Sequence, residues 1–327
     1  REIMKKSFKL FLAAAFLVTE FFVVALPLMI TSAKADGHPI QAITHAGFGG
    51  GTDVTTRMML LRTRRYLKQD MQLVNKKGGG GAASMDYMMT LPADGQHTLT
   101  WTTGHAVSMA LGKTKVKLSD MQPLARGTDD PQLFVVNCKN DIKDAKKFIS
   151  AQKSKSLKYG TTHVGGIDDV SAIAFTKKGK LTDPTIVPYK GVGPIKTNLI
   201  KGDIDVGVLN LGEAVTEIED GTLCVSVVLA SNRMEKLSNV PTATELGIPV
   251  VLSTVRGFVT RKGVPADRKK QLEDAMIKAM EHKYFQSFLT DIGLDSTSVV
   301  GADEWGKQME VMLAEMTAQL KALGYIN

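Results

Sequence analysis

The chain has 327 residues, of which 43% are hydrophobic and 23% are charged. This is enough for two domains with cores of their own, and it excludes a largely disordered or low-complexity protein. The formal net charge is +8, but the basic residues are dispersed and only two Trp and six Tyr offer stacking surfaces. We therefore expect no nucleic-acid partner.

The N-terminus resembles an export signal. A short basic segment precedes an almost wholly apolar run over residues 10–30, and an Ala-Lys-Ala triplet at 33–35 fits a small-x-small cleavage site. The alternative is a retained membrane anchor, which Glu20 and Pro27 inside the apolar run oppose. The sequence predicts a cleaved signal peptide over residues 1–35 and a periplasmic mature protein.

Strand-like and helix-like segments alternate through the first half of the mature chain. Strands are predicted at 39–45, 71–74 and 97–101, and helices at 54–67, at 82–89 and after residue 105. This alternation predicts a mainly parallel sheet with helices on its faces.

A second block repeats the pattern. It has predicted strands at 132–137, 158–161, 185–187, 204–209 and 223–230, and predicted helices at 141–151, from 170 onward and at 194–200. An extended run at 250–259 precedes long helices at 266–281 and 302–323, whose apolar stripes we expect to face a core. The fold class is therefore α/β, with two blocks.

Two short glycine-rich stretches, residues 49–54 and 165–170, nearly repeat each other. Each follows a predicted strand and opens a predicted helix, and Asp53 stands where a helix N-cap belongs. Backbone N–H groups at such a helix start suit an anion, and ligands of open α/β sheets lie at the carboxyl ends of the strands. We expect an anionic small molecule to bind between two lobes.

Other chemistry lacks support in the sequence. The first loop departs from a dinucleotide fingerprint, because Thr52 replaces its third glycine and no acidic residue ends the following strand. The six His residues show no metal-ligand spacing, and no Gly-x-Ser-x-Gly elbow occurs. We predict no cofactor, no metal site and no enzymatic activity.

Only two cysteines, Cys138 and Cys224, are present. Export makes a disulfide chemically feasible, but the sequence does not show that the two side chains meet. The favoured interpretation is two separate buried thiols.

Five segments resemble one family, the periplasmic substrate-binding proteins of tripartite tricarboxylate transporters, or Bug family. Their sequences are Phe-Gly-Gly-Gly-Thr-Asp at 48–53, Asn-Lys-Lys-Gly-Gly-Gly-Gly at 75–81, Val-Pro-Tyr-Lys-Gly-Val-Gly-Pro at 187–194, Gly-Asp-Ile-Asp-Val at 202–206 and Asn-Val-Pro-Thr-Ala-Thr-Glu-Leu-Gly at 239–247. Their order matches the family, and the resemblance covers nearly the whole mature chain.

The resemblance implies a two-lobed "Venus flytrap" fold of the type II kind, with residues 36–132 and 254–327 in lobe 1 and residues 133–253 in lobe 2. It also implies a monomeric receptor that binds a small organic carboxylate and delivers it to membrane permease subunits. A sensor that feeds a signalling partner, or an exported enzyme on the same scaffold, is the alternative.

The family's ligand contacts are carried over to positions in both predicted lobes, and two histidines on candidate pocket loops join them. The predicted ligand-binding residues are Gly49, Gly50, Thr52, Asp53, His105, Thr162, His163, Gly165, Gly166, Asp168, Tyr189 and Asn210.

Three departures from the family pattern bear on specificity. Phe48 replaces a proline, which predicts a less rigid first loop. Asp168 and Asp169 would repel a ligand with several negative charges, so we expect them either to cap their helix or to bind an amine or hydroxyl group. Arg256 stands where an aromatic residue is common, and it is either the partner of a distal carboxylate or a solvated charge.

Overall fold

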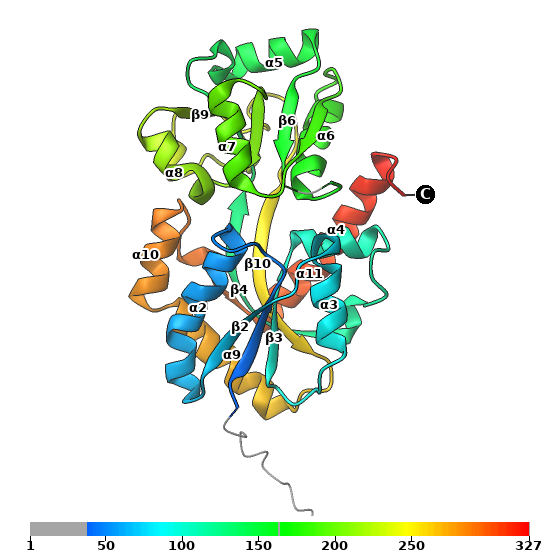
Figure 1. Cartoon of the computed structure of the whole chain (residues 1–327), viewed down its shortest axis with the longest axis vertical. Coiled ribbons are helices and arrows are strands. Elements are labelled where there is room, and N and C mark those ends of the chain that lie inside the picture. Colours follow the sequence, from blue (N-terminus) through cyan, green and yellow to red (C-terminus); the bar gives the residue numbers. More distant parts are fainter. Residues whose placement is uncertain (1–37, 163, 327) are drawn as a thin grey trace, which may run out of the picture. The chain divides into compact units, whose positions relative to one another are not determined.

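The computed structural model describes residues 38–162 and 164–326. These residues form two lobes, each with one sheet flanked by helices (Figure 1). The predicted signal peptide and His163 lie outside the described residues. No helix among the described residues is long and apolar enough to cross a membrane.

The first lobe contains a six-stranded sheet with the order β11-β4-β10-β3-β1-β2. Strand β1 pairs in parallel with β2 and β3, while β10 and β4 run antiparallel to their neighbours. The strands are β1 (Ile40–Thr44), β2 (Met71–Asn75), β3 (His97–Thr102), β4 (Met121–Pro131), β10 (Ser253–Arg261) and β11 (Val300–Gly301).

The second lobe contains a five-stranded sheet with the order β7-β6-β8-β5-β9. Strand β6 pairs in parallel with β7 and β8, and β5 is antiparallel to both β8 and β9. The strands are β5 (Leu133–Asn137), β6 (Lys158–Thr161), β7 (Thr185–Pro188), β8 (Val206–Leu209) and β9 (Leu223–Val228).

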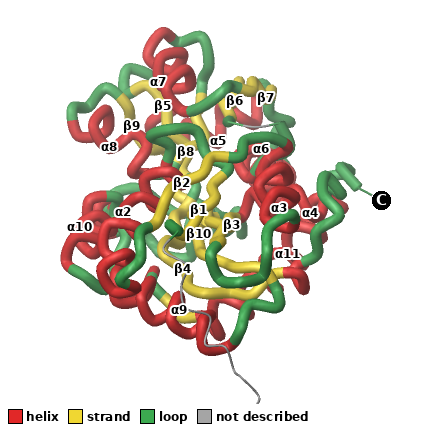
Figure 2. Tube along the Cα trace, turned by 60° about the horizontal axis from the view of Figure 1, so that its bottom comes forward, coloured by secondary structure: helices red, strands yellow, loops and turns green. Residues whose placement is uncertain are grey.

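Helices surround the sheets, which lie in the interior of each lobe (Figure 2). Those of the first lobe are α2 (Gly51–Leu67), α3 (Ala82–Met89), α4 (Thr103–Ala110), α9 (Ala266–Met280), α10 (Lys283–Asp291) and α11 (Ala302–Ala322). Those of the second lobe are α5 (Ala145–Ser154), α6 (Ile167–Lys178), α7 (Val192–Lys201) and α8 (Leu211–Glu219). Short 3-10 turns are η1 (Gly79–Gly81), η2 (Leu118–Asp120), η3 (Asp141–Lys143), η4 (Glu235–Leu237) and η5 (Ser296–Ser298).

The two-lobed α/β fold is confirmed, and the sheets are mixed where the sequence predicts mainly parallel ones. The antiparallel pairs come from the strands that carry the chain between the lobes. Strand β4 ends at Pro131 and β5 begins at Leu133, so one extended path leaves the first sheet and enters the second. Strand β10 returns beside β4 with bulges at Arg256/Gly257 and Phe258/Val259.

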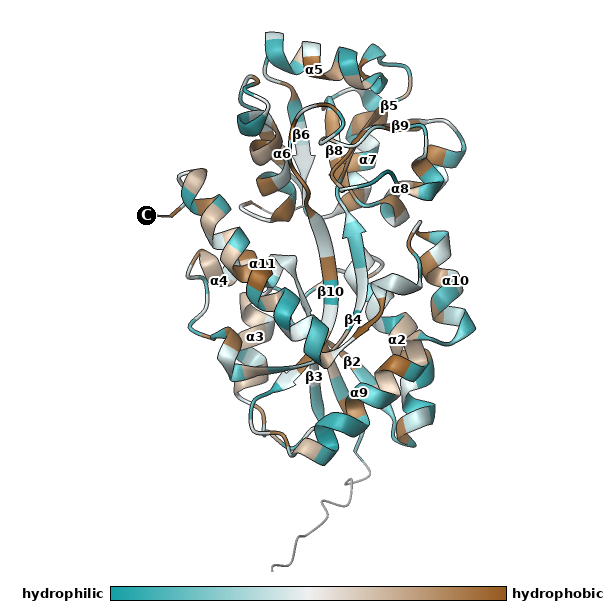
Figure 3. Cartoon of the chain, turned by 180° about the vertical axis from the view of Figure 1, so that it is seen from behind, coloured by the Kyte–Doolittle hydropathy of each residue, from teal (hydrophilic) through white to brown (hydrophobic). Residues whose placement is uncertain are grey.

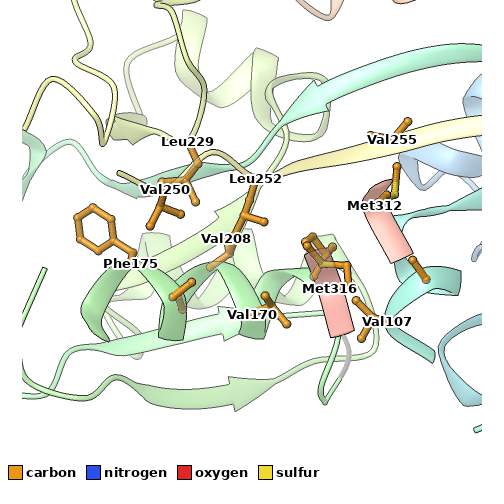
Figure 4. Packing of buried hydrophobic residues seen from close by; sticks show 14 of the residues in the cluster. Val107, Val170, Phe175, Val208, Leu229, Val250, Leu252, Val255, Met312 and Met316 are labelled. Carbon is orange, nitrogen blue, oxygen red and sulfur yellow. The ribbon is translucent and has the colours of Figure 1, made fainter. Parts of the chain in front are cut away.

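One hydrophobic cluster continues from lobe to lobe (Figure 4). Val107 of α4 and Met316 of α11 belong to the same cluster as Val170 and Phe175 of α6. Polar residues colour the outer turns of the helices teal in Figure 3, which fits the amphipathic stripes of the sequence. The lobes are thus packed against each other on the side of α4, α6 and α11.

The interpretation of two separate thiols is wrong, because Cys138 and Cys224 form a disulfide with a Cα–Cα distance of 5.0 Å. Strands β5 and β9 are antiparallel neighbours, and their register pairs Asn137 with Leu223. The same register pairs Val136 with Cys224, so Cys138 lies diagonally opposite Cys224 on the neighbouring strand, which the sequence separation of 86 residues could not show.

Candidate functional site

A cavity of about 360 Å³ lies between the lobes. Its walls come from the start of α2 and the end of α10 in the first lobe, from the starts of α7 and α8 in the second, and from both connecting strands. The lining residues are Gly49, Gly50, Gly51, Val54, Thr55, Asp130, Val192, Gly193, Lys196, Gly212, Glu213, Arg256, Phe288 and Ile292. Two larger hollows on the surface are lined by residues of the first lobe alone.

Three helices begin at this cavity. Gly51, Val192 and Leu211 are the first residues of α2, α7 and α8, and lining residues stand in the first turn of each. The N-cap residues of α2 and α7 are Gly50 and Gly191, so no N-cap side chain covers the N–H groups of their first turns. These N–H groups lack partners within their helices, and the positive ends of the helix dipoles add to them. The arrangement suits an anion held from both lobes.

Arg256 forms one wall of the cavity from strand β10. Its side chain is only 3% exposed, so the alternative of a solvated charge is wrong. The guanidinium forms an ion pair with Asp130 (Nη1–Oδ2 3.0 Å), and it donates to Thr52 Oγ1 (3.2 Å) and to Asn210 Oδ1 (3.1 Å). These contacts join the start of α2, both connecting strands and the start of α8.

Asn210 follows strand β8 directly and is the N-cap of α8. Its Nδ2 donates to the carbonyl oxygens of Asp130 and Pro131, both at 2.9 Å, while its Oδ1 accepts from Arg256. The side chain therefore fixes the start of α8 to the two connecting strands. Two of the predicted ligand residues, Thr52 and Asn210, do not line the cavity themselves. Both accept hydrogen bonds from Arg256, which does line it.

Two carboxylates also line the cavity. Asp130 is 3% exposed, and burial raises its pKa to about 7 although Arg256 lowers it. Glu213 in the first turn of α8 raises that pKa further, and its own Oε2 accepts from the N–H of Asn210 at 3.1 Å. Lys196 of α7 forms an ion pair with Glu217 at 2.6 Å.

The first glycine loop is held by the residue expected to cap its helix. Gly49 has φ +75°, and its N–H donates to Asp53 Oδ2 at 3.0 Å. The same Oδ2 accepts from Arg57 Nε at 2.9 Å, and Oδ1 accepts from Arg57 Nη2 at 3.2 Å. The expectation that Asp53 is the N-cap is wrong, because α2 begins at Gly51, three residues before the predicted start at Val54, and Gly50 is its N-cap. Asp53 instead stands in the first turn and reaches back to the loop.

The second glycine loop has the same construction. Gly165 has φ +68°, its N–H donates to Asp169 Oδ2 at 2.6 Å, and Gly166 is the N-cap of α6. Asp168 adds a contact that the first loop lacks, because its Oδ2 accepts from the backbone N–H (2.8 Å) and the hydroxyl (2.6 Å) of Thr162. Burial raises the pKa of Asp168 to about 7.

The structure does not bring the two glycine loops into the same cavity. Gly49 and Gly50 line it, whereas Thr162, Gly165, Gly166 and Asp168 do not. A Cβ at Gly165 would lie 3.4 Å from Leu111 Cδ1 at the end of α4, on the packed side of the lobes.

Two further predicted residues lie outside the cavity lining. His105 is fully buried, with Nδ1 accepting from the N–H of Thr102 (3.0 Å) and Nε2 at 3.0 Å from Ser84 Oγ. Burial and the neighbouring His45 hold its pKa well below the usual value. Tyr189 is half-buried beside Gly160, and its N–H donates to the carbonyl of Thr161 at 2.7 Å.

Asp130, Glu213 and Lys196 line the cavity but are not among the predicted ligand residues. Asp130 stands in strand β4 and Glu213 in helix α8, and the sequence predicts neither element. The signal available was the run Asn210-Leu-Gly-Glu213, which resembles a capping box. Nothing in the sequence indicates that Asp130 lies near Glu213.

Two lobes joined by two strands, with a cavity that both lobes line, define a bilobal solute-binding protein. The model of the tripartite tricarboxylate transporter family receptor matches residues 55–323, so this chain belongs to that family of receptors. The family resemblance seen in the sequence is confirmed.

The chain is also similar to individual relatives and to solved structures. A protein encoded in the TAR-I ttuE-ttuC' intergenic region of Agrobacterium vitis is 25% identical over 74% of this chain and 71% of its own length. A TctC solute-binding protein from Polaromonas has a TM-score of 0.72 at 24% identity, covering 87% of this chain and 98% of its own. MatC from Rhodopseudomonas palustris with bound malate has a TM-score of 0.77 at 23% identity, covering 86% of this chain and 98% of its own.

Proposed function

We propose that this receptor binds a small organic carboxylate in the cavity between its lobes and delivers it to the membrane permease subunits of a tripartite tricarboxylate transporter. The proposal includes a periplasmic, monomeric protein that catalyses no reaction. It also takes residues 36–132 with 254–327 and residues 133–253 as the two lobes that close on the ligand.

The convergence of three helix N-termini carries this proposal. One carboxylate at the starts of α2 and α7 would meet N–H groups from both lobes, and Arg256 adds a guanidinium on the same cavity. Binding to both lobes at once favours the closed arrangement, because only there do all donors reach the same anion. The malate bound to MatC belongs to the same ligand class.

The test places a competing negative charge at one of these helix starts. Gly193 in the first turn of α7 is exposed, and a Cβ there would meet no atom within 4 Å. Gly193→Asp should keep the fold and stabilise the helix start, while it repels a bound carboxylate. Gly193→Ala is the matched control.

Calorimetry would compare mono-, di- and tricarboxylates on the unaltered protein and on both variants. We expect at least one carboxylate to bind, the alanine variant to bind it similarly and the aspartate variant to lose about tenfold or more in affinity, equivalent to 1.4 kcal/mol. If folded protein binds no carboxylate, or if Gly193→Asp binds as well as Gly193→Ala, the proposal is wrong.

A further inference from the structure

The charges that line the cavity do not match a ligand that is only anionic. Arg256 and Lys196 already form ion pairs with Asp130 and Glu217. Glu213 lines the same cavity, and its Oε2 accepts from the N–H of Asn210. The two cationic side chains that line the cavity are therefore already paired, and a ligand with several carboxylates would meet repulsion.

One acceptor atom at the cavity is left without a partner. Asp130 Oδ2 binds Arg256, but Asp130 Oδ1 is buried and has no hydrogen-bond partner among residues 38–162 and 164–326. A buried carboxylate oxygen without a donor is costly, and such atoms in native proteins are normally satisfied. The residue that carries this oxygen lines the cavity, and a bound molecule that reaches the oxygen would supply the donor.

Asp130 and Glu213 come from different elements, strand β4 and helix α8, and they lie close enough for Glu213 to raise the pKa of Asp130. Two carboxylates that face one space repel each other unless a cation stands between or beside them. Arg256 pairs with one oxygen of Asp130. The other oxygen of Asp130 and the carboxylate of Glu213 have no cationic partner among the residues that line the cavity. A cationic donor on the ligand would satisfy both.

We propose that the ligand of this receptor carries a protonated amine in addition to its carboxylate, and that Asp130 and Glu213 bind this ammonium group. The inference rests on the proposed function, since the carboxylate of the same ligand binds at the helix N-termini. The ligand is then a small zwitterionic amino acid, and Asp130 and Glu213 determine specificity against unsubstituted acids.

The experiment uses ligand sets that differ only in the donor. One set compares short ω-amino acids, from β-alanine to 6-aminohexanoate, with the ω-hydroxy and unsubstituted acids of the same length. The other compares aspartate, malate and succinate. Calorimetry near neutral pH on the unaltered protein should show one amino member binding about tenfold or more tightly than its unsubstituted and hydroxy partners.

Two variants test the assignment of residues. Glu213→Gln and Asp130→Asn should each reduce the ratio of affinities between amino and unsubstituted members toward one. Asp129→Asn is the matched control, because Asp129 stands next in the chain but binds Arg126, Ser253 and Gln308 and does not line the cavity. In Asp129→Asn the ratio of affinities between amino and unsubstituted members should stay unchanged. If Asp130→Asn fails to fold, Glu213→Gln alone decides.

The outcomes separate the two proposals. Binding of unsubstituted acids as tight as that of amino members refutes the ammonium inference alone, and so does equal binding of hydroxy and amino members. An unchanged ratio in Glu213→Gln also refutes it. If no member of any set binds, the proposed function and this inference both fail.

Discussion

The contact between Asp53 and Gly49 makes a quantitative prediction about the first glycine loop. Asp53→Ala removes a buried carboxylate that accepts the Gly49 N–H at 3.0 Å and stands in the first turn of α2. A hydrogen bond to a charged group contributes about 1.5–3 kcal/mol. A negative charge near a helix start adds about 0.3–1 kcal/mol. Because such terms are not additive, we expect a loss of about 2–3 kcal/mol in the free energy of unfolding.

Matched variants separate the loop contact from the ion pair. Asp53→Asn keeps an acceptor for Gly49 and should lose less than Asp53→Ala. Arg57→Ala removes the partner of the ion pair, whose side chain is 49% exposed, so it should cost only a fraction of the Asp53→Ala effect.

Urea unfolding followed by circular dichroism measures these changes, and calorimetry with a bound carboxylate measures their effect on the site. Affinity should fall in Asp53→Ala, because Gly49 and Gly50 line the cavity. The reasoning is refuted if Arg57→Ala is as destabilising as Asp53→Ala, or if Asp53→Ala changes neither stability nor affinity.

Three other expectations follow from the structure. Asp168 has a folded pKa of about 7 against an ordinary value of 3.8, so the native state binds the extra proton. The free energy of unfolding should therefore fall as pH rises from about 4 to about 7. Urea titrations across that range should show a smaller fall in Asp168→Asn. If the free energy of unfolding of Asp168→Asn falls with pH as steeply as that of the unaltered protein, the prediction is wrong. Reduction of the Cys138–Cys224 disulfide opens a link of 86 residues and should cost up to about 4–5 kcal/mol in thermal or urea unfolding, with a Cys138→Ser/Cys224→Ser variant unaffected by reductant. Gly51→Ala would place a Cβ 2.5 Å from Arg256 Nη2, so it should displace the guanidinium and weaken carboxylate binding by about tenfold or more; unaltered affinity would show that Arg256 moves freely.

Local patterns in the sequence determined much of the fold. The strand at Lys158–Thr161 and the helix at Ala82–Met89 have the predicted bounds, because apolar periodicity and flanking glycines mark them. The near-repeat of the two glycine loops also predicts real likeness, since Gly49 and Gly165 both adopt positive φ and both donate to an Asp four residues later.

Long-range pairing determined the rest. Strand β4 contains Pro123, Gly127 and several charged residues, so its composition argues against a strand. It is nevertheless extended along Met121–Pro131, because β10 and β11 pair with it from more than 120 residues away. The same pairing buries Asp130 beside Arg256, and no local pattern marks Asp130 as part of a site.

The sequence by itself determined the class of protein, through two α/β blocks, glycine loops at helix starts and five segments in the order of one family. Only the tertiary structure decided which helix starts share a cavity. It grouped α2 with α7 and α8 rather than with α6, and it placed Asp130, Glu213 and Arg256 on the same walls. The physical reason is that helix starts and strands are local, whereas the charges that face one ligand are brought together by connections between two sheets.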